Sequence, residues 1–384
     1  MSFCEQWNTF CFRQGKDNRK KIIKACAMTD YREEFKQLLE NTFISTMWDE
    51  GRQKKEIKSF LEKVYSIIPD KLFRYRKFDE YTIKSFGDGS ISLCKAKCFP
   101  DKYDSLIFVD VEENRRLMYD GYVKGMQGVL ESIKQKDPSL RAEKASKLCY
   151  YLEQGMTEQE AIEQVVKEEY GQDLLQVVKD LKKRETRFRD SERTARIACF
   201  TESIQSKFMW DTYAGGYRGF ALEYNLKELL INCIQKGSPV YVFPVIYTDE
   251  RPDLTTDEAN LYIITKAHEQ GHVNNLGFFK PLVYPNLLSP HKPFLYKDKE
   301  EYAHEKEWRV LFYDKNNCEN YFEIPDEGCL KAIYYGMDIE QDDYNTLHQI
   351  ALKKGIEEYR VVIDDNSRKY KLKVIPNKSQ QIDF

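Results

Sequence analysis

Two short stretches of the chain hold side chains whose types and spacing could support catalysis. The first contains His268, Glu269 and His272, in the H-E-x-x-H spacing of zinc peptidases. On a helix the two histidines lie one turn apart, where they could bind zinc while the glutamate acts as a base. The second stretch, His304–Arg309, gathers His, Glu, Trp and Arg in a chain that has only five His and four Trp. Both stretches are therefore candidate sites.

The surroundings of the first stretch do not complete a zinc site. Gly271 lies inside the motif and polar residues follow it, which predicts that the preceding helix ends there. The longer pattern of this peptidase class needs a glycine where Asn275 stands and a third histidine where Phe278 stands. We therefore expect no metal, and a zinc peptidase that uses His268 and His272 is kept as the alternative.

Composition limits the class of protein. The 384 residues carry a net charge of −3 and are 41% hydrophobic, which predicts a sizeable core and no general attraction to nucleic acid or acidic membranes. The apolar runs are shorter than the roughly 18 residues that a membrane span requires. The first residues lack the pattern of a signal peptide, and the ten cysteines form no C-x-x-C pair. We expect a cytoplasmic protein with reduced thiols and no membrane contact.

Hydrophobic periodicity divides the chain into three parts. Residues 1–70 show helical spacing, residues 71–110 predict a strand, a helix and a strand, and 193–384 place further strands irregularly between helices. Residues 111–192 are highly charged and rich in helix formers. We predict an α+β fold with a mixed or antiparallel sheet built from 71–110 and 193–384. The segment 1–70 would be an N-terminal helical segment, and 111–192 a helical insertion that offers a protein-contact surface.

Four blocks of rare residues resemble the bacterial family of uncharacterised proteins called DUF2971. They begin at Leu72, Cys199, His304 and Ala332, and run in the family's order over roughly 72–110 and 196–376. The first block, which runs on to Cys98 and the residues after it, departs from the family, because Pro-Asp-Lys stands at residues 100–102 where the family has Asn-Asp-Pro.

A weaker resemblance links the chain to ADP-ribosyltransferases of the Arg-Ser-Glu type. Arg74 follows Leu-Phe, Ser203 follows Phe-Thr-Glu, and Glu305 and Glu307 come later, which is the order in that family. The resemblance implies an ADP-ribosyltransferase-like sheet and NAD as substrate. It also implies ADP-ribosyl transfer or NAD hydrolysis, as in a bacterial toxin or phage-defence effector. The acceptor, protein or nucleic acid, stays unknown.

The same resemblance implies roles for individual residues. Glu307 would stabilise the oxocarbenium-like transition state, Glu305 would orient the acceptor, and Arg74 would hold a phosphate or the ribose. The full set of predicted ligand contacts is Arg74, Tyr75, Thr201, Ser203, Trp210, Tyr213 and Arg309.

A structural role for these residues is the competing interpretation. Arg74, Glu307 and Arg309 would then form a buried ion-pair network between strands, with Trp210 and Trp308 in the core. A non-enzymatic binding module, with the helical insertion contacting a partner, is a further alternative.

Overall fold

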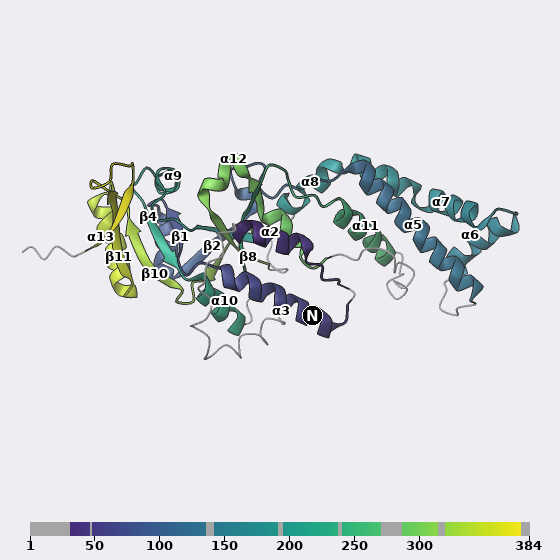
Figure 1. Ribbon diagram of the computed structural model, residues 1–384, viewed down its shortest axis with the longest axis horizontal. Helices are drawn as coiled ribbons and strands as arrows, with labels where there is room; N and C mark the ends of the chain where they lie inside the picture. Colours follow the sequence, from purple (N-terminus) through teal and green to yellow (C-terminus); the bar gives the residue numbers. More distant parts are fainter. Residues whose placement is uncertain are drawn as a thin grey trace, which may run out of the picture.

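The computed structural model describes residues 31–46, 48–135, 142–190, 195–236, 240–269, 286–313 and 319–377. Figure 1 shows an elongated molecule in which one sheet extends from the middle to one end, where α13 lies, and long helices form the other end. None of the described helices is long and apolar enough to cross a lipid bilayer.

One mixed sheet forms the core of the described chain. Its ten strands are β1 Leu72–Arg76, β2 Ser90–Lys95, β3 Arg196–Thr201, β4 Phe220–Tyr224, β5 Val240–Pro244, β8 Glu307–Phe312, β9 Tyr321–Pro325, β10 Leu330–Tyr335, β11 Glu357–Ile363 and β12 Leu372–Pro376. The main order is β12-β11-β10-β4-β1-β3-β2-β9, and β8 pairs both β3 and β5. Only β10 and β11 pair in parallel within this sheet. The predicted α+β class and mixed sheet are confirmed.

Strand β3 joins the two halves of the sheet. It pairs β8 along its whole length, from Arg196 to Thr201. On its other side it touches β2 near Cys94 and β1 only where Phe73 faces Thr201. This register fixes which side chains of distant strands share a face, because side chains alternate between the faces of a sheet.

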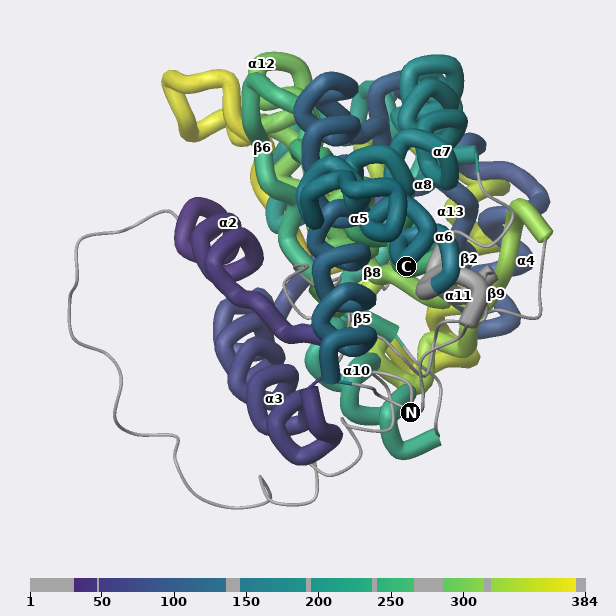
Figure 2. The backbone as a smooth tube through the Cα atoms, turned by 90° about the vertical axis from the view of Figure 1, so that its right-hand side faces the viewer, coloured from purple at the N-terminus to yellow at the C-terminus, as the bar shows by residue number. Residues whose placement is uncertain are grey.

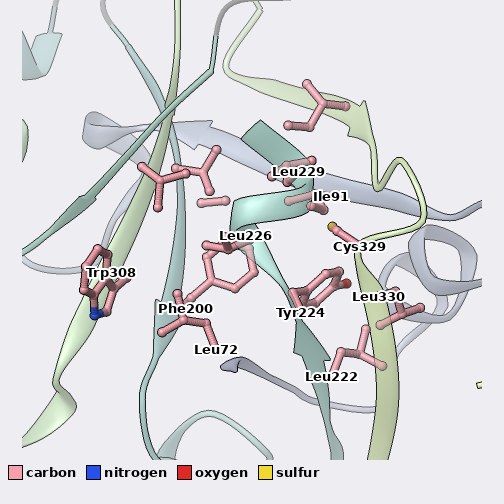
Figure 3. Packing of buried hydrophobic residues seen from close by; sticks show 14 of the residues in the cluster. Leu72, Ile91, Phe200, Leu222, Tyr224, Leu226, Leu229, Trp308, Cys329 and Leu330 are labelled. Carbon is pink, nitrogen blue, oxygen red and sulfur yellow. The ribbon is translucent and has the colours of Figure 1, made fainter. Parts of the chain in front are cut away.

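Helices cover both faces of the sheet. On one face, α4 (Glu80–Asp88), α10 (Leu226–Gln235) and α13 (Gln341–Lys354) enclose a core that includes Trp308 and Phe200, shown in Figure 3. On the other, α2 (Tyr31–Asn41) and α3 (Glu50–Ile67), which lie next to each other in Figure 2, pack against Phe243 and Leu311. The apolar residues of β8 alternate accordingly, so this strand is buried on both sides.

The helices between β2 and β3 form a separate cluster. They are α5 (Val111–Lys134), α6 (Ala142–Glu153), α7 (Glu158–Lys179) and α8 (Leu181–Asp190). Thr157 and Glu160 form a reciprocal capping box at the start of α7. From the later part of the chain, α11 (Thr255–Glu269) packs on α5 through Ala259 and Ile263. The stretch 193–384, expected to build the sheet core, thus contributes one helix to this cluster.

Four short elements complete the surroundings of the site. They are α9 (Lys207–Thr212), α12 (Lys299–Tyr302), β6 (Ile246–Thr248) and β7 (Tyr296–Asp298). β6 and β7 pair in parallel as a two-stranded sheet. This small sheet carries Tyr247 and Lys297 to the entrance of β8.

Candidate functional site

Glu307 is the first residue of β8 and Glu305 ends the short turn before it, and both are buried. Between them Lys306 adopts a left-handed conformation with φ 49°, which turns the chain from a short 3₁₀ turn into the strand. Both carboxylates meet the ammonium group of Lys297, whose Nζ lies 2.9 Å from Oε2 of Glu305 and 3.1 Å from Oε2 of Glu307. The strand entrance therefore concentrates two negative charges around one positive charge.

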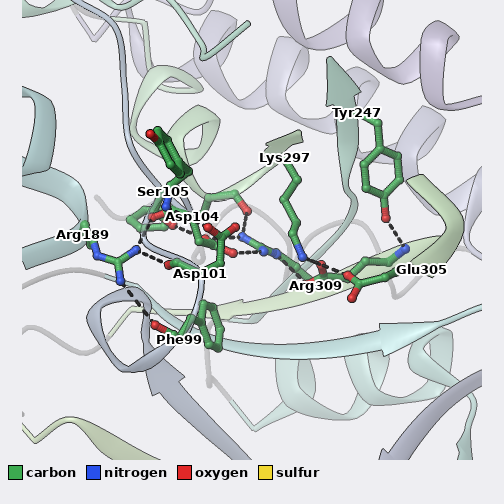
Figure 4. A network of polar contacts seen from close by, with 12 residues as sticks. Phe99, Asp101, Asp104, Ser105, Arg189, Tyr247, Lys297, Glu305 and Arg309 are labelled. Carbon is green, nitrogen blue, oxygen red and sulfur yellow. Dashed lines mark hydrogen bonds and ion pairs between the residues drawn. The ribbon is translucent and has the colours of Figure 1, made fainter. Parts of the chain in front are cut away.

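Arg309 extends this cluster into a buried network, drawn in Figure 4. Its Nε donates to Oε1 of Glu307 at 2.8 Å. Its two terminal nitrogens donate to the carboxylate of Asp104 at 3.0 and 2.5 Å, and one of them also donates to the Phe294 carbonyl at 2.8 Å. Two cations and three carboxylates, counting Glu305, thus share one buried cluster.

The network controls the protonation of its members. Burial raises the pKa of Glu307, but the charges of Arg309 and Lys297 outweigh it and lower that pKa to about 2. Burial and then the charge of Glu307 raise the pKa of the Cys199 thiol well above its usual range. At neutral pH Glu307 is therefore ionised, while the thiol stays protonated and hydrogen-bonds that carboxylate.

The two carboxylates differ in how fully their oxygens are occupied. Glu307 accepts from Arg309, Lys297 and the Cys199 thiol. Glu305 accepts from the Tyr213 hydroxyl at 2.6 Å and from Lys297. A carboxylate offers about four acceptor positions, so Glu305 retains more capacity for a ligand.

Backbone contacts hold the strand entrance in place. The Thr201 hydroxyl donates to the Glu305 carbonyl at 2.6 Å, which braces that residue through its backbone. Arg32 on α2 donates to the Glu307 carbonyl at 2.9 Å, and the Tyr247 hydroxyl accepts from the Glu307 amide at 2.7 Å. Sequence reasoning did not single out Arg32, Tyr247 or Lys297 as members of the site.

Arg74 does not join this network. Because Phe73 pairs with Thr201, and Thr201 with Glu307, the side chain of Glu307 shares a face of the sheet with Phe73. Arg74 is the next residue of β1 and projects from the opposite face. There its Nη2 donates to the Ser92 carbonyl at 2.6 Å. The structure therefore does not bring Arg74 and Glu307 to one cleft.

The other predicted ligand contacts fall into two groups. Tyr75 and Trp210 are buried, with ring centroids 5.0 Å apart, in a small apolar cluster of the sheet. The Ser203 carbonyl accepts from the Tyr75 hydroxyl at 2.7 Å, so this serine supports the same cluster. Tyr213 is 39% exposed and bonds Glu305 directly, which makes it the predicted aromatic residue with access to solvent and to the network.

A cleft of about 640 Å³ opens beside the network. Its lining comes from the loop after β2, the loop 248–253 between β6 and α11, and the turn from β7 into α12. Lys297 belongs to both places, because it lines the cleft beside Tyr302 and also binds the two glutamates. The cleft and the network are therefore connected through Lys297.

The zinc alternative falls largely outside the described residues. The helix that carries it runs from Thr255 to Glu269, in agreement with the predicted helix, but the side chain of His268 and the whole of His272 are not described. Within the described ranges, no three His, Cys, Asp or Glu side chains are grouped so as to hold a metal ion.

The fold and the site define a mixed α+β protein with a buried polar network beside an open cleft. Residues 209–310, about a quarter of the chain, match the family described as "Protein of unknown function (DUF2971)". The matched segment includes Trp210, Tyr213 and the Glu305–Arg309 part of the network, and it supports the resemblance to DUF2971. No curated protein and no solved structure matches the chain. The bacterial origin and the resemblance to ADP-ribosyltransferases therefore stay predictions.

Proposed function

We propose that the protein cleaves the bond between nicotinamide and ribose in NAD, and passes ADP-ribose to an acceptor or to water. The observation that carries this proposal is the pair of buried carboxylates, Glu305 and Glu307, held around Lys297 beside a tyrosine-lined cleft. Carboxylates close to the reacting sugar stabilise an oxocarbenium-like transition state.

The reaction suits a site that is rich in negative charge. The glycosidic bond breaks with its electron pair staying on the pyridinium nitrogen, which leaves as neutral nicotinamide. Positive charge then develops on the ribose, and a nucleophile or water forms the new bond to its anomeric carbon. The proton released by that nucleophile passes to a carboxylate, for which we propose Glu305.

The geometry divides the work between the two glutamates. Among the described residues, the Glu305 side chain bonds only Tyr213 and Lys297, so it is the carboxylate we assign to contact with the substrate. Glu307 is saturated by Arg309, Lys297 and Cys199, so we assign it a positioning role through Lys297. This reverses the emphasis that the family resemblance gave to Glu307.

Phosphate recognition finds support in a second hollow next to the cleft. This hollow shares the 248–253 loop and Tyr296 with the cleft, and the rest of its lining includes three lysines, Lys36, Lys292 and Lys299, together with Glu33 and Glu40. Ammonium groups bind phosphate oxygens by charge-assisted hydrogen bonds. A dinucleotide lying across the loop would place its nicotinamide in the cleft and its pyrophosphate by the lysines, so this assignment does not need Arg74.

The test is nicotinamide release from NAD, together with transfer of labelled ADP-ribose in buffer and in cell extract. We expect Glu305→Gln to lower the rate by about a hundredfold or more, as loss of a transition-state contact does. Glu300→Gln, an exposed glutamate of α12, serves as the matched control and should keep the full rate. Melting temperatures of all variants separate loss of chemistry from loss of folding. If the wild type neither releases nicotinamide nor transfers ADP-ribose, the proposal is wrong.

Binding without catalysis is the second candidate, and one observation favours it. Glu307 and Arg309 neutralise each other within a buried network, as an ion pair that only holds strands together would do. If the wild type binds NAD or another ligand but converts none of it, this second function replaces the first.

A further inference from the structure

The cleft beside the network carries an unusual charge pattern. Its lining includes six carboxylate side chains, from Asp101, Asp249, Glu250, Asp253, Asp298 and Glu301. Only two cationic side chains, Arg251 and Lys297, belong to the same lining. The excess of negative charge lowers the energy of a cation entering the cleft, since low-dielectric walls focus the field of charged groups.

Both cations are already engaged by carboxylates that lie outside the lining. Arg251 approaches Glu185 at 3.5 Å and donates to the Ile107 carbonyl at 3.1 Å. Lys297 is bound between Glu305 and Glu307. By contrast, the six lining carboxylates form no ion pair with any cation among the described residues. No paired cation among the described residues therefore neutralises their charge, although Asp101, Asp253 and Asp298 each accept a hydrogen bond from a backbone amide.

Aromatic rings make up the rest of the wall. Tyr103 is 72% exposed and Phe108 is 41% exposed, so both rings face solvent at the cleft. The Tyr302 ring already has a cation over its face, because Nζ of Lys297 lies 3.8 Å from its centroid. Ring faces carry negative partial charge and attract cations most strongly when these shed water.

The arrangement favours an organic cation over a metal ion. A divalent metal requires several ligands converging on one point. No three acidic, histidine or cysteine side chains converge in this way within the described part of the chain. Charges spread along a wall, combined with aromatic faces, suit a ligand whose positive charge is spread over a flat or bulky organic group.

We propose that the cleft binds an organic cation, with Asp101 and Glu301 supplying charge and Tyr302 a ring face. These three side chains line the same cleft, together with Lys297, whose Nζ lies over the Tyr302 ring. The identification of that cation with the pyridinium ring of NAD rests on the proposed function. The preference for positive charge does not rest on it.

Two ligands of nearly the same shape test the charge preference. 1-Methylnicotinamide carries the pyridinium charge and nicotinamide does not, so their affinities are compared by calorimetry on the full-length chain. We expect the cation to bind at least about tenfold more tightly, the ratio that about 1.4 kcal/mol produces. Equal affinity of the two ligands, or absence of binding by the cation, would overturn the inference.

Variants then locate the effect. We expect Glu301→Gln to weaken binding of 1-methylnicotinamide by several-fold and to leave nicotinamide unchanged, because its side chain lines the cleft without a partner among the described residues. Glu300→Gln removes the same charge one residue away, outside the lining, and should leave both affinities unchanged. Tyr302→Leu should also weaken binding of 1-methylnicotinamide. Equal losses in Glu301→Gln and Glu300→Gln would show a general surface effect and overturn the assignment.

The outcomes also separate this inference from the proposed function. Selective binding of the cation by a protein that does not cleave NAD supports the cleft assignment and overturns the enzyme. Cleavage of NAD without any preference for the charged ligand supports the enzyme and overturns the cleft assignment.

Discussion

The two faces of the central sheet differ in whether their buried cations are paired with carboxylates. On the face covered by α2 and α3, Arg309 and Lys297 are surrounded by three carboxylates, from Asp104, Glu305 and Glu307. On the opposite face, Arg74 and Arg76 lie two residues apart on β1 and form no ion pair with a carboxylate among the described residues.

The arginine face is held by one serine instead. Arg74 donates to the Ser92 carbonyl and Arg76 to the Ser92 hydroxyl, each at 2.6 Å, while Nη1 of Arg74 has no partner among the described atoms. Burial, and then the charge of Arg76, lower the pKa of Arg74. Removing one member of a buried ion-pair network leaves the other members buried with unpaired charges, which is strongly destabilising. Removing a buried cation that has no carboxylate partner leaves no such unpaired charge, so its loss changes stability little. The difference predicts unequal responses to mutation.

The largest expected effect is on the carboxylate-rich face. Arg309→Met leaves Asp104 and Glu307 buried without the guanidinium that binds both, and should lower the free energy of unfolding by about 3–5 kcal/mol. Urea denaturation measures this loss. Arg116→Met is the control, because Arg116 pairs with exposed carboxylates on α5 and its loss should change stability little. Similar losses in both variants would contradict a structural role for the network.

Acid should weaken the same face in two steps. Burial lowers the pKa of His291 to about 4, so the folded state disfavours its protonation, and stability present above about pH 6.5 is lost as pH falls through 4. Glu307, with its pKa near 2, contributes stability above about pH 4.5 that is lost as pH falls toward 2. The first step is worth on the order of 3 kcal/mol.

Stability measured between pH 7 and 3 separates these steps. His291→Gln should remove the loss between pH 6.5 and 4.5, because the buried ring is gone, and keep the loss at lower pH. An unchanged profile in this variant would mean that other groups govern the first step. The arginines of the opposite face stay charged throughout this pH range, so they do not change the free energy of unfolding with pH.

Strands and the carboxylate pair were predictable from local sequence. The apolar runs at β3 and β8 and the alternation at β2 reflect burial on one or both faces, which sequence records directly. Glu305 and Glu307 attracted notice because rare residues surround them. These features depend on residues close together in the chain.

Contacts between distant segments were not predictable. Lys297 stands in a charged turn that resembles a solvated surface, and only the pairing of β6 with β7 brings it to β8. The alternation of β1 separates Arg74 from Phe73, but the sequence does not say which of them shares a face with Glu307. The single register pair of β1 and β3, Phe73 with Thr201, decides that point.

The smallest expected effect tests the arginine face. Arg74→Met removes one of two like charges and one hydrogen bond to a carbonyl, and leaves no carboxylate unpaired among the described residues. We expect the free energy of unfolding to change by less than about 1 kcal/mol, since the relief of repulsion offsets the lost bond. Urea denaturation next to Arg309→Met makes the comparison direct.

The variant Arg74→Met also tests whether Arg74 binds NAD, as the sequence resemblance implies, or lies away from the site, as its place on the sheet indicates. If Arg74 held the phosphate of NAD, as the resemblance implies, Arg74→Met would raise the KM for NAD. Because the register places Arg74 on the face opposite Glu307, we expect KM and the rate of nicotinamide release to stay at the wild-type values. A rise in KM with unchanged stability would return Arg74 to the ligand site. It would also require the substrate to contact both faces of the sheet.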